Sequence, residues 1–206
     1  MQIIQKNDPE GPRKAAEVLV SGGVIIYPTE TLYGIGALAT NERAVNRVFD
    51  IKGRASGKPI PVLVKNIEML IEFAEVTPLG LKLTREFLPG PLTLVLRQKR
   101  KLPDIISGGT GKVGFRISSH PFVKSLFEFL DEPITSTSAN LSGEENLLSF
   151  HEIYGEFRDL VDLIVDGGRL FPSKGSTVVD LTTTPPTMVR EGEIEPRVLE
   201  RHYEGW

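Results

Sequence analysis

The residues of this chain that could do chemistry are hydroxyl-bearing and cationic side chains in short loops. Residues 28–36 read Pro-Thr-Glu-Thr-Leu-Tyr-Gly-Ile-Gly, where Thr29 and Thr31 offer hydroxyls beside glycines that permit close approach of a ligand. Residues 136–142 form a second run, Ser-Thr-Ser-Ala-Asn-Leu-Ser, whose small polar groups suit a ribose or a phosphate. Either run could instead be a turn that caps its own backbone, and for residues 28–36 taken alone we favour that turn.

Cations gather beside these runs. Lys52, Arg54 and Lys58 follow an amphipathic segment and are separated by small residues, a pattern that suits a loop wrapping an oligophosphate. Cations at the end of a helix are also favoured by the helix dipole, so part of this pattern is ordinary capping. Arg116 and Arg190 lie in or at the end of apolar runs. A buried-facing arginine needs an anionic partner, so each implies a ligand or a structural carboxylate.

Several common kinds of site are excluded. The chain has no cysteine, which removes disulfides, thiolate catalysis and iron–sulfur clusters. Its three histidines, His120, His151 and His202, share no metal-ligand spacing, which argues against zinc. Residues 108–114 resemble a phosphate-binding loop but lack the glycine and Ser/Thr positions of a Walker motif and the spacing of a dinucleotide fingerprint. We therefore expect no metal ligands from the protein itself.

Length and composition predict an ordinary globular protein. The 206 residues, 40% hydrophobic and 25% charged, fit a single domain over residues 1–206. The N-terminus has no signal-peptide core and no apolar run reaches the roughly 20 residues of a membrane helix, so we expect a cytoplasmic protein without membrane contact.

The net charge of −3 is unevenly distributed. Residues 43–116 hold fourteen Lys/Arg against six Asp/Glu, and the remainder of the chain is acidic. This contrast is either a scatter of solvated charges or a basic surface or cleft that attracts phosphates or carboxylates.

Helical and strand-like patterns are mixed along the chain. Helices are predicted at 12–20, 41–51, 67–74, 78–88, 121–130 and 150–160. Strands are predicted at 24–27, 61–64, 92–96, 113–117, 134–138, 163–165, 177–181 and 187–190. The two do not alternate strictly, which favours an α+β or irregular mixed α/β sheet over a Rossmann fold. The polar runs at 28–36 and 136–142 then follow strands directly.

Taken in order, these segments resemble the YrdC family, the threonylcarbamoyl-AMP synthases. The matching pieces lie at 28–36, 52–54 with 58–59, 89–93, 114–116, 120–121, 137–143, 166–168, 176–178 and 189–192. The family's Lys-x-Arg and Ser-x-Asn signature is met by Lys52, Arg54, Ser138 and Asn140. The resemblance implies the short form of the fold, a twisted mixed sheet with helices packed around a large concave basic cavity. Leu63 stands where some members carry histidine, and the loop after Asn140 lacks an arginine of longer relatives.

The resemblance also implies an activity and its residues. The expected reaction is a nucleotidyltransferase step that forms threonylcarbamoyl-AMP and pyrophosphate from L-threonine, bicarbonate and ATP, for N6-threonylcarbamoyladenosine at tRNA position 37. The catalytic residues it implies are Lys52, Arg54, Ser138 and Asn140. The same four residues would bind ATP together with Lys58 and Arg190. Threonine would be bound by Thr29, Arg116 and Ser176, with Arg116 holding the carboxylate through a bidentate fork.

The implied partners follow from this reaction. Mg²⁺ would accompany ATP, held mainly by phosphates because no carboxylate cluster is apparent. A separate tRNA threonylcarbamoyl transferase would take the product, and contact with tRNA or double-stranded RNA is a further expectation. The alternative reading is a non-enzymatic double-stranded RNA- or tRNA-binding module of the same fold. The basic stretch lacks interleaved aromatic residues, which weakens that alternative.

Overall fold

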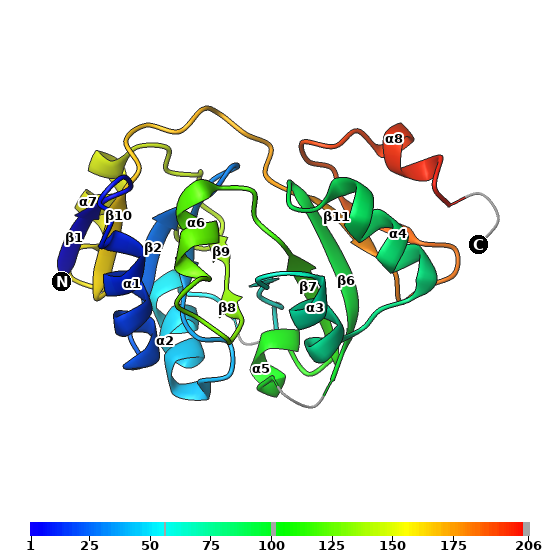
Figure 1. Ribbon diagram of the computed structural model, residues 1–206, viewed down its shortest axis with the longest axis horizontal. Helices are drawn as coiled ribbons and strands as arrows, with labels where there is room; N and C mark the ends of the chain where they lie inside the picture. Colours follow the sequence, from blue (N-terminus) through cyan, green and yellow to red (C-terminus); the bar gives the residue numbers. More distant parts are fainter. Residues whose placement is uncertain (56, 100–101, 204–206) are drawn as a thin grey trace.

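The chain is described by a computed structural model that covers residues 1–55, 57–99 and 102–203. Figure 1 shows two lobes side by side, each built on its own sheet. The sheet of the N-terminal lobe runs in the order β1 (Gln2–Gln5), β10 (Leu163–Asp166), β2 (Ile25–Pro28), β3 (Tyr33–Gly36) and β9 (Thr137–Ser138). β1, β10 and β2 pair in parallel, whereas β3 is antiparallel to both β2 and β9.

The second sheet is also mixed. Its order is β12 (Thr187–Arg190), β11 (Thr177–Asp180), β6 (Leu92–Gln98), β7 (Lys112–Arg116), β4 (Val62–Leu63) and β8 (Ile134–Thr135), and β5 (Ala74–Glu75) pairs with β6. β11 runs parallel to β6 and β4 parallel to β7, while β6 and β7 are antiparallel. The predicted mixed α/β fold is confirmed, with the strands divided between two sheets.

One short stretch of chain pairs with both sheets where they meet. Residues 134–138, predicted as one strand, divide into β8, which pairs with β4, and β9, which pairs with β3. Ser136 lies between them, and its amide donates to the Pro61 carbonyl at 2.8 Å. Polar residues at 136–138 are therefore held where both sheets meet.

Helices pack around both sheets (Figure 1). In the N-terminal lobe, α1 (Gly11–Val20) and α6 (Pro121–Leu126) contact β2, and α7 (Phe150–Phe157) contacts β10. α2 (Glu42–Lys52) begins at Asn41, whose side chain accepts the Ala44 amide, and it ends beside the site. α3 (Ile67–Phe73), α4 (Pro78–Phe87) and α5 (Asp104–Ser107) lie on the second lobe, with α8 (Pro196–Glu200) near the C-terminus (Figure 1). α2 of the N-terminal lobe contacts α5 of the second.

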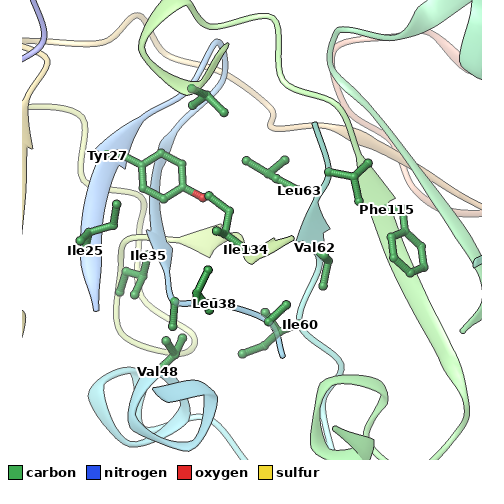
Figure 2. Packing of buried hydrophobic residues seen from close by; sticks show 14 of the residues in the cluster. Ile25, Tyr27, Ile35, Leu38, Val48, Ile60, Val62, Leu63, Phe115 and Ile134 are labelled. Atoms are coloured by element: carbon green, nitrogen blue, oxygen red, sulfur yellow. The ribbon is translucent and has the colours of Figure 1, made fainter. Parts of the chain in front are cut away.

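One hydrophobic core runs through both lobes. Figure 2 shows Tyr27 and Ile35 of the first sheet facing Leu63 of the second across Ile134, and all four are buried. Burial of such side chains contributes about 1.5–3 kcal/mol each, so the two sheets are packed together rather than tethered. Among the residues described, no helix is long and apolar enough to cross a membrane.

The structure differs from the sequence-based prediction in several local respects. Residues 33–36, expected in a loop, form β3, and Pro28 is the last residue of β2 rather than the residue after it. A Cβ on Gly36 would lie 2.7 Å from the Thr135 carbonyl oxygen, so this strand needs its glycine to pack closely. The helix predicted at 121–130 ends at Leu126.

Candidate active site

A cavity of about 510 Å³ lies on the open face of the second sheet. Alternate residues of the strands point to one face, and those of β6 and β7 that line the cavity are Thr93, Val95, Lys112, Gly114 and Arg116. From the other lobe it is lined by the β2–β3 turn and by residues 136–138. A Cβ on Gly114 would lie 2.8 Å from Cγ2 of Thr93, so glycine keeps this floor open.

The cavity is cationic. Arg54, Lys112, Arg116 and Arg190 line it, and Asp180 is the one carboxylate among the described lining residues. Burial lowers the pKa of Arg190, and the nearby charge of Arg116 lowers it further. Two guanidinium groups therefore share one hollow, an arrangement that an anionic ligand would stabilise.

Six of the nine residues predicted for the site line this cavity. They are Thr29, Arg54, Arg116, Ser138, Ser176 and Arg190. They come from six separate segments of the chain, so the fold brings together residues that the sequence keeps far apart. Lys52, Lys58 and Asn140 are not among the described lining residues.

Lys52 lies behind the cavity wall rather than in it. Its side chain is 2% exposed, and Nζ donates to the carbonyl oxygens of Ser138 at 2.5 Å and Asn140 at 2.6 Å. Burial and the charge of Arg54 lower the pKa of Lys52 to about 8. The buried ammonium group thus fixes the 138–140 turn, from which Ser138 lines the cavity.

The other members of the signature are held by local hydrogen bonds. Asn140 accepts from Oγ of Ser138 at 2.6 Å and donates to the Glu144 carbonyl at 2.7 Å. The Arg54 guanidinium donates to the carbonyl oxygens of Lys58 at 3.2 Å and Pro59 at 2.7 Å, and the Lys58 side chain is exposed. Arg54 therefore helps to hold the conformation of the loop that also carries Lys58.

The hydroxyl of Thr29 is used by its own turn. Oγ1 donates to the Leu32 carbonyl at 2.7 Å and accepts the amides of Thr31 and Leu32, each at 3.2 Å. This is the turn that the sequence favoured for residues 28–36 taken alone. Thr29 still lines the cavity, while its hydroxyl is committed to the backbone.

Arg116 pairs with a carboxylate of the same turn. Its Nη2 lies 2.8 Å from Oε1 of Glu30, and its Nε donates to the Gly90 carbonyl at 3.1 Å. The sequence allowed a ligand or a structural carboxylate as the partner of a buried arginine, and the structure supplies Glu30. Sequence reasoning did not single out Glu30, although it is the only acidic residue within 28–36.

Ser176 and Arg190 form the opposite side of the site. Arg190 Nη2 donates to the Ser176 carbonyl at 2.7 Å and to its Oγ at 3.0 Å, and Oγ lies 2.8 Å from Oγ1 of Thr93. Lys112 and Asp180 form an ion pair of 3.2 Å in the same cavity. Thr93, Lys112 and Asp180 were not predicted; each occupies an inward position of a strand, a signal that is available once the sheet register is known.

The sequence model of the Sua5/yciO/yrdC family, described as "Telomere recombination", matches residues 17–192. The chain belongs to this family. The Sua5/YciO/YrdC match thus includes every segment that lines the cavity, from the β2–β3 turn to Arg190.

Two relatives carry the name of an activity. The chain is 37% identical to the threonylcarbamoyl-AMP synthase of Pyrococcus abyssi over 92% of its own length, and spans 56% of that protein. It is 36% identical to a putative threonylcarbamoyl-AMP synthase of Methanocaldococcus jannaschii, covering 98% of this chain and 96% of the relative.

Solved structures have the same fold. The crystal structure of P. abyssi Sua5 in complex with L-threonine superposes with a TM-score of 0.91 at 35% identity, over 98% of this chain and 60% of that one. Escherichia coli YciO gives a TM-score of 0.86 at 30% identity, over 94% of this chain and 96% of that one. The chain is thus comparable in length to the short members of the Sua5/YciO/YrdC family.

Proposed function

We propose that this chain is a threonylcarbamoyl-AMP synthase, which forms threonylcarbamoyl-AMP and pyrophosphate from L-threonine, bicarbonate and ATP. The observation that carries the proposal is the cavity in which Arg54, Arg116 and Arg190 converge with hydroxyl groups from both lobes. Its volume of about 510 Å³ is in the range of small-molecule sites. The family, the names of its relatives and the L-threonine complex of one of them support the same activity.

The chemistry requires positioning and charge neutralisation. The amine of threonine attacks carbon dioxide released from bicarbonate and forms a carbamate. A carbamate oxygen then attacks the α-phosphorus of ATP, and the bond to the β-phosphate oxygen breaks, releasing pyrophosphate. Neither step needs a covalent nucleophile from the protein, because aligned reactants and fixed cations lower such a barrier. A site of arginine, lysine, serine and threonine side chains is suited to this task.

The roles divide between two ends of the cavity. Arg54 would hold the phosphates, with the exposed Lys58 near its loop and Arg190 on the far side of the nucleotide. Ser138 would contact the α-phosphate and ribose region, on a turn fixed by Lys52 and Asn140. Arg116 and Ser176 would bind threonine beneath the turn of Thr29. The resemblance to the YrdC family implies these roles, and the residues' places around the cavity or behind its wall are compatible with them.

The residues present fit a magnesium ion that is bound through its substrate. Among the described residues no group of three or more His, Cys, Asp or Glu is placed to hold a metal ion, and Asp180 is already paired with Lys112. Mg²⁺ would therefore be held mainly by the phosphates of ATP, where it neutralises their charge. The side chains of this chain would orient that complex.

The proposed product defines the partners. Threonylcarbamoyl-AMP is a mixed anhydride that would be consumed by a separate transferase acting on adenosine 37 of tRNA. Direct contact of this chain with tRNA or double-stranded RNA would use the cationic mouth of the same cavity.

The proposal is tested by following pyrophosphate release with ATP, Mg²⁺ and bicarbonate, with and without L-threonine. We expect release to depend on both threonine and bicarbonate. Tight, salt-sensitive RNA binding without threonine-dependent release would contradict the proposal and support the binding module instead.

A further inference from the structure

Glu30 lies next to the candidate active site but outside the residues described as lining its cavity. A second cavity, of about 600 Å³, lies on the other side of the turn of residues 29–31, and Glu30 lines this second cavity but is not among the described residues that line the first. Thr29 and Thr31 line both. Glu30 therefore reaches the active cavity through Arg116 and makes no contact with a ligand there.

Glu30 is itself held in place. Oε1 accepts the amide of Ser119 at 3.1 Å and Oε2 accepts the hydroxyl of Ser118 at 2.5 Å, while Arg116 supplies the ion pair of 2.8 Å. Burial alone would raise the pKa of Glu30, but the charge of Arg116 and the Ser118 hydrogen bond outweigh it and the pKa is lowered. The group is a carboxylate with three donors fixed around it.

Arg116 also contacts the hydroxyl of Thr31, which in turn contacts the hydroxyl of Thr29. Arginine only donates, so Oγ1 of Thr31 accepts from Nη1 at 3.1 Å and from Nη2 at 3.2 Å. Oγ1 of Thr29 already donates to the Leu32 carbonyl, so the Thr31 hydroxyl donates to Thr29 at 3.1 Å. Both hydroxyls are then fully used, and neither has a proton left for a ligand.

One N–H group of Arg116 has no partner among the contacts described above. A guanidinium has five N–H groups. Nε is bonded to Gly90, one Nη1 proton and one Nη2 proton to Thr31, and the other Nη2 proton to Glu30. One Nη1 N–H remains on a residue that lines the cavity. A ligand carboxylate would therefore meet a single fixed N–H in place of a two-pronged fork.

We propose that Glu30 is a positioning residue, which orients Arg116 so that its one remaining Nη1 N–H meets the carboxylate of the amino-acid substrate. The inference rests on the proposed function, because it takes threonine as the ligand of Arg116. Without Glu30, the guanidinium is free to turn about its long side chain, and the single N–H is no longer aimed. A hydrogen bond to a charged group weakens steeply when its donor is no longer aligned with the acceptor.

The test is calorimetric binding of L-threonine and of ATP to the full chain. We expect Glu30→Gln to raise the Kd for L-threonine by about tenfold or more, because an aligned hydrogen bond to the carboxylate is lost, and to leave the Kd for ATP unchanged. Asp162→Asn is the matched control. Its carboxylate also pairs with an arginine, Arg47 at 2.7 Å, and accepts a backbone amide, Val24 at 2.7 Å, outside the cavity. This control should leave both Kd values unchanged.

L-threoninamide separates positioning from a general structural effect. It lacks the carboxylate, so wild type should bind it more weakly than L-threonine, whereas Glu30→Gln should bind the two with nearly equal affinity. An equal loss of affinity for both ligands would make Glu30 merely structural and overturn the inference. So would an unchanged Kd for L-threonine.

Two further outcomes are distinguishable. If Glu30→Gln fails to fold, Ser118→Ala removes one hydrogen bond to Glu30 while keeping the ion pair, and it should weaken L-threonine binding in the same direction by a smaller factor. No such weakening would overturn the inference. If wild type binds ATP but not L-threonine, the proposed function fails first and the role of Glu30 falls with it.

Discussion

Lys52 is buried at the end of α2, and its ammonium group reaches the carbonyl oxygens of Ser138 and Asn140. The sequence predicted that Lys52 binds phosphate, because three cations separated by small residues lie at and after the end of a helix. The geometry places the lysine one layer behind the cavity, where it fixes the turn that presents Ser138. A spacing pattern identifies a group as important to a site but does not determine whether it faces the ligand.

The buried charge of Lys52 predicts a pH-dependent stability. Its pKa is about 8 in the folded protein and near 10.5 when unfolded, so between these values the unfolded chain binds more protons. Stability from this group is therefore lowest below pH 8 and rises as pH increases from 8 to 10.5. Urea unfolding at pH 7.5 and 10 should show wild type gaining stability relative to Lys52→Met. An equal difference at both pH values would contradict the shifted pKa.

Arg54 is expected to act directly on the reaction. It lines the cavity with a guanidinium group that no described carboxylate neutralises. Arg54→Ala should remove about 2–4 kcal/mol of transition-state stabilisation, roughly a 30- to 1000-fold loss in kcat/KM. Arg13→Ala is the control, because Arg13 of α1 forms exposed ion pairs with Glu10 and Glu17, outside the cavity. Steady-state kinetics in which both variants lose activity equally would remove Arg54 from the proposed mechanism.

At the scale of elements, the regular helices and strands could be predicted from local pattern. α2 shows why: Asn41 caps it, and Ala44, Val45 and Val48 lie at helical spacing on its buried face. β3 could not be predicted in this way, because its two glycines are required by close packing against the neighbouring strands rather than by local preference. The break at Ser136 depends on strands distant in sequence, so its position too is fixed only by tertiary contacts.

The floor of the cavity depends on a glycine of β7. A methyl group on Gly114 would lie 2.8 Å from Thr93, whose hydroxyl is bonded to Ser176. Gly114→Ala should destabilise the fold by about 1–3 kcal/mol through overpacking and should also weaken L-threonine binding.

Gly155→Ala is the matched substitution in α7, where nothing lies within 4 Å of the added Cβ. It should stabilise the protein by roughly 0.5–1 kcal/mol without changing affinity. Thermal unfolding and calorimetry on both variants check the pair, and normal threonine affinity in Gly114→Ala would contradict the role given to this floor.

At the scale of the whole molecule, part of the excess positive charge of residues 43–116 lies in the cavity. Arg54, Lys112 and Arg116 come from the basic stretch of residues 43–116, and Arg190 joins them from a distant segment. Six of the predicted site residues line one cavity. These residues could be predicted from the sequence, because the motifs that contain them match a known family in order. The contacts of Glu30 with Arg116, of Thr93 with Ser176 and of Asp180 with Lys112 could not be found that way, because they depend on which elements lie side by side.

A cationic cavity predicts a salt-dependent affinity for nucleotide. Raising the ionic strength from 0.1 to 1 M shortens the screening length from about 10 to about 3 Å. The Kd for ATP should therefore rise with salt, and the Kd for the zwitterion L-threonine should rise less. Calorimetry at the two salt concentrations measures both, and equal salt dependence would argue against convergence of cations on the phosphates.

The central claim is that one hollow holds an amino acid and a nucleotide together so that a carbamate oxygen reaches the α-phosphate. Its most direct test is incubation of the chain with ATP, Mg²⁺, L-threonine and ¹³C-bicarbonate, followed by mass spectrometry of the nucleotide products. We predict a new nucleotide that contains threonine and one ¹³C atom and forms only when all substrates are present. If AMP and pyrophosphate appear with no labelled adduct in a rapidly quenched sample, the claim is contradicted.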